Sequence, residues 1–289
     1  TSIENKEIDK SLNLKIYPFE DNFVSRRMRV ENDSLKYLKK NNFPVPGIYK
    51  SFFEFNCSFY EFQSGKKNLK ATKQLIDQCY DFLKKLFLLS KKTKINLFPN
   101  AKEACFNPNE ICEQIEKKFN NLLKINNKAL NNFLLLEFQD LFTKFSKIVK
   151  SKLGKKFKNN ISNSNRILSP SDFGLHNTLS EKNKLYFLDF EYFGWDDPIK
   201  LICDFFWHPG NNMSKKLKDR FLNKVTNFFS KKYKNFKNKL YVLLPLYGLR
   251  WSLIILNCFF KKNYKNKILE TQQLKKAKKI LNQVSHYGY

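Results

Sequence analysis

The stretch that decides the fold is SPSDFGLHN (residues 169–177), which is followed closely by LYFLDFEYFGWDDP (residues 185–198). Together they supply Asp172, then Asn177 in an Asp-x4-Asn spacing, then Asp189 inside the apolar run LYFLDF. In phosphoryl transfer one Asp orients the attacking hydroxyl, while an Asn and a second Asp hold a metal ion. Magnesium is a hard cation that prefers carboxylate and amide oxygens. The spacing therefore predicts a site for magnesium and a nucleoside triphosphate; two turns with solvated acids are the alternative.

Composition limits the class of protein. The chain has 289 residues, of which 42% are hydrophobic and 16% aromatic, so it is long and apolar enough for two lobes with a real core. The formal net charge of +28 would suit a nucleic acid, but the lysines are spread over nearly every polar segment. We therefore expect no specific nucleic-acid binding. The composition does not determine the oligomeric state.

Cysteine usage and hydropathy bear on the compartment. The six cysteines form no Cys-x-x-Cys pair, which indicates buried thiols in a reducing environment, and the polar start of the chain does not resemble a signal peptide. We therefore expect a cytoplasmic protein. The apolar segment 241–260 approaches the length of a membrane span, but Pro245, Arg250 and Asn257 interrupt it. We expect a core helix there and no membrane span.

The pattern of the chain changes after its first quarter. Residues 11–17 and 52–62 are aromatic and β-branched enough to form strands, and residues 25–41 between them carry apolar side chains at helical spacing. The remainder is mostly helical in pattern. We therefore predict an α+β protein with an N-terminal nucleotide-binding lobe over residues 1–63 and a helical C-terminal lobe over residues 64–289.

Several residues allow two interpretations. Asp196 and Asp197 either line an acceptor pocket or cap the helix that begins at Pro198, and we favour capping. Arg250, in an otherwise apolar helix, pairs either with a buried acid or with an anionic group of a substrate. His176, beside Asn177, is expected to be a satisfied loop histidine, because Asp172 already serves phosphoryl transfer.

These motifs resemble those of the aminoglycoside phosphotransferase and choline kinase family, the small-molecule branch of the protein-kinase-like fold. PSDFGLHN is similar to the family's HGDxxxxN loop, and FLDFEYFGWDDP is similar to its IDFExAGxGDP run; the resemblance covers residues 12–256. It implies a bilobal fold with a small β-rich lobe, possibly truncated, and a larger helical lobe. It also implies transfer of the γ-phosphoryl group of ATP to an alcohol.

The resemblance also implies residue roles. LKIYP places Lys15 at the family's strand lysine, which would bond the α- and β-phosphates, and RRMRVENDSLKYL places Glu31 at its partner glutamate. Asp172 would align the acceptor hydroxyl as the catalytic base, while Asn177 and Asp189 would hold Mg²⁺.

Weaker parts of the resemblance concern the adenine and the catalytic loop. YEFQSG is similar to the segment that joins the lobes, where the backbone of Glu61 and Phe62 would bond the adenine edge. Asp204 is similar to the family's aspartate that braces the catalytic loop. Pro170 and Ser171 stand where the family usually has His-Gly, so support for that loop must come from elsewhere.

The start of the chain departs from the family pattern. No glycine precedes Gly47, and the fourteen residues before Lys15 are too few for a full phosphate-covering hairpin. We expect the phosphate cradle to be missing, diverged or encoded before Thr1.

The acceptor is constrained by charge. After Asp204 the chain has only two acids, Asp219 and Glu270, which disfavours polycationic aminoglycosides. Choline would need an aromatic cage, and core packing explains the candidate aromatic residues equally well. These candidates are Phe205, Phe206, Trp207, Tyr247 and Trp251. We expect a hydroxyl of a sugar-like or other neutral or anionic metabolite. The alternatives are a catalytically weak kinase-like nucleotide-binding module and, less favoured, a basic nucleic-acid-binding protein.

Overall fold

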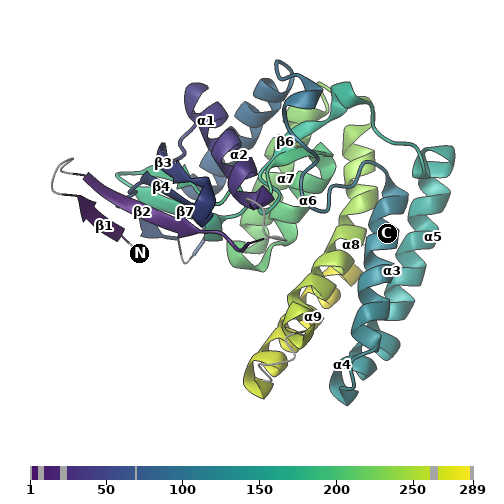
Figure 1. Ribbon diagram of the computed structural model, residues 1–289. Helices are drawn as coiled ribbons and strands as arrows, with labels where there is room; N and C mark the ends of the chain where they lie inside the picture. Colours follow the sequence, from purple (N-terminus) through teal and green to yellow (C-terminus); the bar gives the residue numbers. More distant parts are fainter. Residues whose placement is uncertain (1, 6–9, 20–24, 69, 261–265, 287–289) are drawn as a thin grey trace. The chain divides into compact units, whose positions relative to one another are not determined.

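The computed structural model describes residues 2–5, 10–19, 25–68, 70–260 and 266–286 (Figure 1). The chain forms two compact units. The first, called here the sheet unit, comprises Thr1–Ala104, Asn163–Leu201 and Pro209–Leu222; the second, the helical unit, comprises Cys105–Ser162, Ile202–His208 and Asn223–Tyr289. The lobe boundary predicted after residue 63 is a different division and stays a prediction.

An antiparallel sheet with the strand order β1-β2-β4-β3 opens the sheet unit. Its strands are β1 (Ser2–Asn5), β2 (Lys10–Ile16), β3 (Ile48–Phe52) and β4 (Cys57–Glu61). The strand predicted over residues 52–62 is in fact interrupted by a turn, η1 (Phe53–Phe55), and Asn56 has a left-handed φ of 46°. This turn reverses the chain, so that β3 and β4 form a hairpin.

Helix α1 (Arg26–Lys40) follows β2, as the periodicity predicts. It buries Met28, Leu35 and Leu38 on one face. The helix ends where Asn42 takes a φ of 59° and two prolines follow within the next four residues, because proline cannot continue a helix.

The two motif stretches lie on short antiparallel elements of the sheet unit, which pack on helix α2 (Lys73–Ser90). Phe82 of α2 stacks on Phe187 with ring centroids 3.8 Å apart and on Phe173 at 5.7 Å. Because these two rings flank Asp172 and Asp189 in sequence, aromatic packing anchors both motifs to one helix. The elements are β5 (Lys66–Lys67), β6 (Ile167–Ser169), η6 (Leu175–Asn177), β7 (Thr178–Glu181), β8 (Lys184–Phe187) and β9 (Gly194–Asp196), with η2 (Ile95–Leu97), η5 (Asn163–Asn165) and η7 (Pro209–Asn211) nearby in this unit.

The helical unit is built around long helices. The order Asn107, Pro108, Glu110 predicts a helix start, and Asn107 does cap α3, since its side chain accepts from the Glu110 amide at 3.0 Å and the Glu110 carboxylate accepts from the Phe106 amide at 2.6 Å. The sequence pattern predicts one helix over residues 130–149, but a π-helical segment divides it. The elements are α3 (Pro108–Leu123), α4 (Lys128–Asn132), the π-helical η3 (Phe133–Phe138), α5 (Gln139–Leu153), η4 (Gly154–Phe157), α8 (Phe236–Ile254), η8 (Ile255–Phe260) and α9 (Lys267–His286), while α6 (Pro198–Trp207) and α7 (Lys215–Phe229) have residues in both units.

Helix α8 is the core of the helical unit. By length and composition the segment Phe236–Phe260 could cross a membrane, but 72% of its most apolar 18-residue stretch is buried inside the protein. It packs against α3, α5 and α9. A Cβ atom at Gly248 would lie 2.3 Å from Val284, so the glycine allows α9 to approach closely. These contacts agree with the predicted core helix.

Candidate active site

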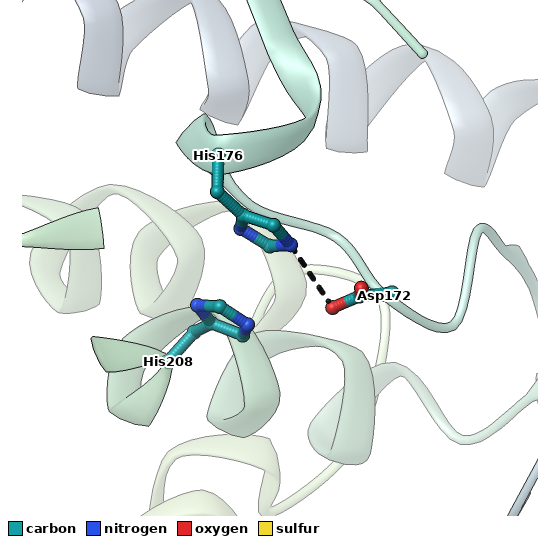
Figure 2. Close-up of side chains that lie close together, drawn as sticks. All are labelled: Asp172, His176 and His208. Carbon is teal, nitrogen blue, oxygen red and sulfur yellow. Dashed lines mark ion pairs between the residues drawn. The ribbon is translucent and has the colours of Figure 1, made fainter. Parts of the chain in front are cut away.

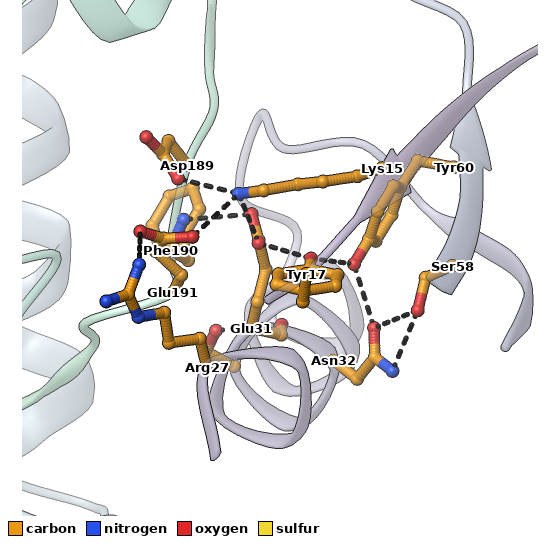
Figure 3. Close-up of polar contacts among 11 residues, drawn as sticks. Lys15, Tyr17, Arg27, Glu31, Asn32, Ser58, Tyr60, Asp189, Phe190 and Glu191 are labelled. Atoms are coloured by element: carbon orange, nitrogen blue, oxygen red, sulfur yellow. Dashed lines mark hydrogen bonds and ion pairs between the residues drawn. The ribbon is translucent and has the colours of Figure 1, made fainter. Parts of the chain in front are cut away.

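The Lys15 ammonium lies among three carboxylates (Figure 3). Its Nζ atom is 2.6 Å from Glu31 Oε2 on α1, 2.8 Å from Asp189 Oδ1, and 3.4 Å from Glu191 Oε2. The fold thus brings together three predicted site residues, Lys15, Glu31 and Asp189, although Lys15 and Asp189 are 174 positions apart. Sequence reasoning did not place Glu191 in this cluster.

Glu31 is held by more than the lysine. Its Oε2 atom also accepts a hydrogen bond from the Tyr17 hydroxyl at 2.5 Å, and its Oε1 atom accepts the Phe190 amide at 3.1 Å. The Tyr60 hydroxyl lies 2.5 Å from that of Tyr17 and 3.0 Å from Asn32 Oδ1 (Figure 3). The buried carboxylate therefore joins β2, α1 and the segment after β8.

The tyrosines of this network were not predicted as site residues. A signal was present in the sequence, because Lys15 and Tyr17 alternate along one strand and therefore share a face of the sheet. The identity of their shared acceptor, Glu31, could not be read from that alternation.

Burial and neighbouring charge shift the pKa values of this cluster. Burial opposes the charge on Lys15, but the carboxylates of Glu31 and Asp189 outweigh it, so the pKa of Lys15 is raised. Burial raises the pKa of Glu31, against the effect of Lys15. Three donors nevertheless converge on the Glu31 carboxylate, and this geometry suits its ionised form. Burial and the nearby Glu31 charge raise the pKa of Tyr60 to about 12.

Asp172 lies in the loop between β6 and η6, with 41% of its side chain exposed. The Asn177 amide nitrogen donates to the Asp172 backbone oxygen at 3.0 Å and to its Oδ2 atom at 3.3 Å. His176 Nε2 is 3.2 Å from Asp172 Oδ1, on the other carboxylate oxygen (Figure 2). The candidate base is thus oriented by two residues of η6, His176 and Asn177.

Support for this loop comes from two serines. The Ser171 amide donates to Ser169 Oγ at 3.0 Å, and Ser171 Oγ donates to the Lys102 carbonyl at 3.0 Å. Ser171 has a φ of 69°, a conformation that L side chains rarely adopt. These hydrogen bonds support the loop although Pro170 and Ser171 stand in place of His-Gly.

Asp189 differs in detail from its prediction. The apolar run LYFLDF predicts a buried strand around Asp189, but β8 ends at Phe187, and Asp189 has a φ of 65° and a side chain 40% exposed. The Leu188 amide donates to the Asn177 carbonyl at 2.9 Å, which joins the two motifs. The left-handed turn after the strand releases the carboxylate from the sheet, so that it meets Lys15. Strained backbone of this kind is common at functional sites.

The donor set of this site can be tested for a metal. Oxygens of Glu31, Asp189 and Glu191 lie within 4.8 Å of one another, but the Lys15 ammonium contacts all three, so a cation already lies among them. Since the Asn177 amide nitrogen donates to Asp172, its amide oxygen remains as a hard ligand, and Asp189 has a second carboxylate oxygen. Asn177 and Asp189 therefore have donor atoms that suit Mg²⁺.

The predicted adenine segment lies at the end of β4. The Glu61 amide donates to the Gly47 carbonyl at 2.9 Å, and its carboxylate accepts from the Gly47 amide at 2.9 Å and from Lys39 at 2.8 Å. The amide of Glu61 is therefore engaged in the sheet. Its carbonyl and the backbone of Phe62, whose side chain is 44% exposed, stay as predicted adenine contacts.

Two open alternatives are resolved in favour of local pairing. Asp197 Oδ1 accepts the Ile199 amide at 2.7 Å, which caps α6, and Asp196 pairs with buried Lys200 at 3.0 Å. Arg250 pairs with Asp204 at 3.0 Å within the helical unit. The bracing role predicted for Asp204 stays a prediction.

The aromatic residues considered for a choline cage are almost fully enclosed in the protein. Trp251 is the most exposed of them, at 9%, and its Nε1 atom donates to Asp204. Core packing therefore accounts for them. They are Phe205, Phe206, Trp207, Tyr247 and Trp251.

No protein-family model and no curated protein matches this sequence. Solved structures do match. A choline/ethanolamine kinase family protein from Mesorhizobium loti has a TM-score of 0.62 at 14% identity over 96% of this chain and 85% of its own. An amicoumacin kinase in complex with AMP-PNP and Ca²⁺ has a TM-score of 0.59 at 14% identity, covering 98% and 84%. The aminoglycoside phosphotransferase APH(4)-Ia, a thermostable mutant in complex with ADP and hygromycin B, has a TM-score of 0.57 at 11% identity, covering 98% and 92%.

The chain has the fold of these small-molecule kinases. The predicted α+β, protein-kinase-like fold is therefore confirmed. At identities of 11–14% the likeness concerns the fold, and the chemistry must be argued from the residues of this chain.

Proposed function

We propose that this protein is an ATP- and Mg²⁺-dependent phosphotransferase that acts on an alcohol hydroxyl of a small metabolite. The observation that carries the proposal is the Lys15 ammonium, held 2.6 Å from Glu31 and 2.8 Å from Asp189. A lysine paired with a helix glutamate, next to a metal-binding aspartate, is the arrangement that phosphoryl transfer from ATP requires in this fold. The nucleotides bound by the similar kinases support the same substrate.

The nucleotide would be held by the sheet unit. Lys15 would bond the α- and β-phosphates as a compact charge, while Glu31 fixes the lysine through its own contacts with Tyr17 and Phe190. The backbone at Glu61 and Phe62 would meet the adenine edge.

The transfer itself needs positioning and charge neutralisation. Asp172 would accept the proton of the acceptor hydroxyl as that oxygen bonds the γ-phosphorus, while the bond to the β–γ bridging oxygen breaks and ADP leaves. Asn177 and Asp189 would hold Mg²⁺, which when bound neutralises charge on the phosphate oxygens. The contacts of Asn177 and His176 would keep the Asp172 carboxylate directed.

The acceptor is proposed to be a sugar-like or other neutral or anionic hydroxyl compound, because acids are scarce after Asp204. We propose a cytoplasmic setting on the grounds that none of the six cysteines is joined in a disulfide bond. A catalytically weak nucleotide-binding module is the second candidate. It is favoured by Pro170 and Ser171, which stand where the resembled family usually has His-Gly.

The test combines binding with turnover. Thermal shift with ATP and MgCl₂ across sugars, amino alcohols and aminoglycosides should find an acceptor, and ADP release should then follow its concentration. Asp172→Asn should lower turnover by at least about 10²-fold while nucleotide binding remains. The matched control Asp219→Asn changes an exposed acid of α7 and should leave turnover unchanged. Nucleotide binding without transfer to any alcohol would favour the second candidate.

A further inference from the structure

A cavity of about 420 Å³ lies beside Lys15 and its carboxylates, entirely within the sheet unit. Its walls are the first turn of α1, residues 99–102 and residues 191–193. This volume is in the usual range for a small-molecule site. The cavity is not used by the nucleotide, metal or base assignments above, apart from sharing Glu191 with the Lys15 cluster.

The charge of this cavity is strongly one-sided. Arg26, Arg27 and Lys102 line it, while Glu191 is the one carboxylate among the described residues of its wall. Glu191 is moreover shared, since one of its oxygens is 3.4 Å from Lys15 and the other 3.7 Å from Arg27 (Figure 3). Among the described residues of the wall, cationic side chains are therefore in excess of carboxylates.

The start of α1 adds to this excess. The first-turn amides of a helix carry a partial positive charge, so acids are favoured there and cations are not. The first turn of this 15-residue helix has no acid and begins with Arg26 and Arg27. Two arginines at this end break a local rule of helix stability. Such exceptions occur where function offsets their cost.

Tyr192 brings two of the cations together. Lys102 Nζ lies 4.0 Å from the centroid of the Tyr192 ring, and Arg27 Cζ lies 5.3 Å from it. Attraction to one aromatic ring holds the two like charges in the same cavity, although they repel each other. An anion between them would relieve that repulsion.

The cavity adjoins both motifs of the candidate active site. The Lys102 carbonyl accepts from Ser171 Oγ at 3.0 Å, directly before Asp172, and the Lys102 amide donates to the Tyr192 carbonyl at 3.3 Å. Glu191, on the opposite wall, contacts Lys15. A ligand in the cavity would therefore touch segments that hold the base and the phosphate-binding lysine.

We propose that this cavity binds the phosphate group of a small phosphorylated compound, through Arg26, Arg27 and Lys102 with Tyr192 beside it. The dianion would compete with Glu191 for Arg27. Two sources share this chemistry: the group belongs either to the acceptor or to a separate effector. The acceptor version rests on the proposed function, whereas the anion site itself does not.

The first experiment measures binding without turnover. Inorganic phosphate is titrated by calorimetry at constant ionic strength, because exposed charges are screened by salt. Arg27→Gln and Lys102→Gln should each weaken binding by about fivefold or more, as expected for loss of one charged contact. Glu191→Gln should tighten binding, since it removes the competing carboxylate.

Three control variants locate the phosphate. Lys15→Met removes the nucleotide lysine and should leave phosphate bound in the cavity. Lys237 lines a lysine-rich pocket of the helical unit, and Lys216 is an exposed residue of α7. The variants Lys237→Gln and Lys216→Gln should both bind phosphate as the unaltered protein does. Binding that is lost in Lys15→Met or Lys237→Gln, and unchanged in Arg27→Gln and Lys102→Gln, would overturn the proposal.

The second experiment separates the two sources. Pairs of hydroxyl compounds with and without a phosphate are compared as acceptors, and inorganic phosphate is added as an inhibitor. Competition with the acceptor, lost in Arg27→Gln, identifies an acceptor subsite. A rate change without competition identifies an effector. If no compound is phosphorylated, the proposed function is wrong, while the calorimetry still tests the anion site. If the protein binds no phosphate, the anion site is wrong, while the proposed phosphoryl transfer is unaffected.

Discussion

Two charged clusters, one in each unit, differ in charge balance and in solvent exposure. In the helical unit Arg250 and Asp204 expose 7% and 5% of their side chains, and each has further protein partners. Arg250 Nε donates to Gln114 at 2.9 Å, and Trp251 donates to Asp204 at 2.8 Å. This cluster is balanced and closed.

The Lys15 cluster in the sheet unit is neither balanced nor closed. Three carboxylates surround one ammonium, and Lys15 and Asp189 expose 32% and 40% of their side chains. Such an arrangement can exchange a protein contact for a phosphate or a metal without leaving a buried charge unpaired. Ion pairing alone therefore does not distinguish the two clusters, which differ in their charge balance and in their access to solvent.

The largest effect is expected from Lys15→Met, which removes the cation of the open cluster. Phosphoryl transfer, measured as kcat/KM for ATP, should fall by about 10²–10³-fold, as for loss of one group that stabilises the transition state. Lys36 is an exposed residue of α1, so Lys36→Met is the control and should have little effect. Activity within tenfold of the unaltered protein would remove Lys15 from the phosphate site.

Breaking the closed cluster should instead cost stability. Arg250→Met leaves Asp204 buried without its cation, so the free energy of unfolding in urea should fall by about 3–5 kcal/mol. The double variant Arg250→Met with Asp204→Asn removes the uncompensated charge and keeps an acceptor for Trp251. It should recover part of the loss; a double variant as unstable as the single one would contradict this account.

The smallest effect concerns pH and the tyrosines behind Glu31. The pKa of Tyr60 rises from 10.0 to about 12 on folding, mainly by burial. As the pH rises, the unfolded chain thus loses this proton first. The contribution of Tyr60 to the free energy of unfolding is therefore present below pH 10 and is lost as the pH rises through 12. Between these values the slope is at most about 1.4 kcal/mol per pH unit. Urea unfolding of Tyr60→Phe at pH 9, 10 and 11 should show a shallower decline than the unaltered protein; an identical decline would exclude Tyr60 as its source.

The sequence predicted some contacts of the candidate site better than others. Lys15, Glu31 and Asp189 were chosen by motif order, and the fold brings them together. The cap at Asn107 was also predictable, because capping acts over three residues. Tyr17 and Glu191 were missed as site residues, since each matters through a partner distant in the chain.

What the sequence by itself determined was local: the α1 periodicity, the helix caps and the Asp-x4-Asn spacing of the catalytic loop. Only the tertiary structure decided that Asp189 leaves its strand at a φ of 65°, and that Arg26, Arg27 and Lys102 line one cavity. The physical reason is distance along the chain. Periodicity and capping act over a few residues, whereas charge excess and burial arise only when segments far apart in sequence pack together.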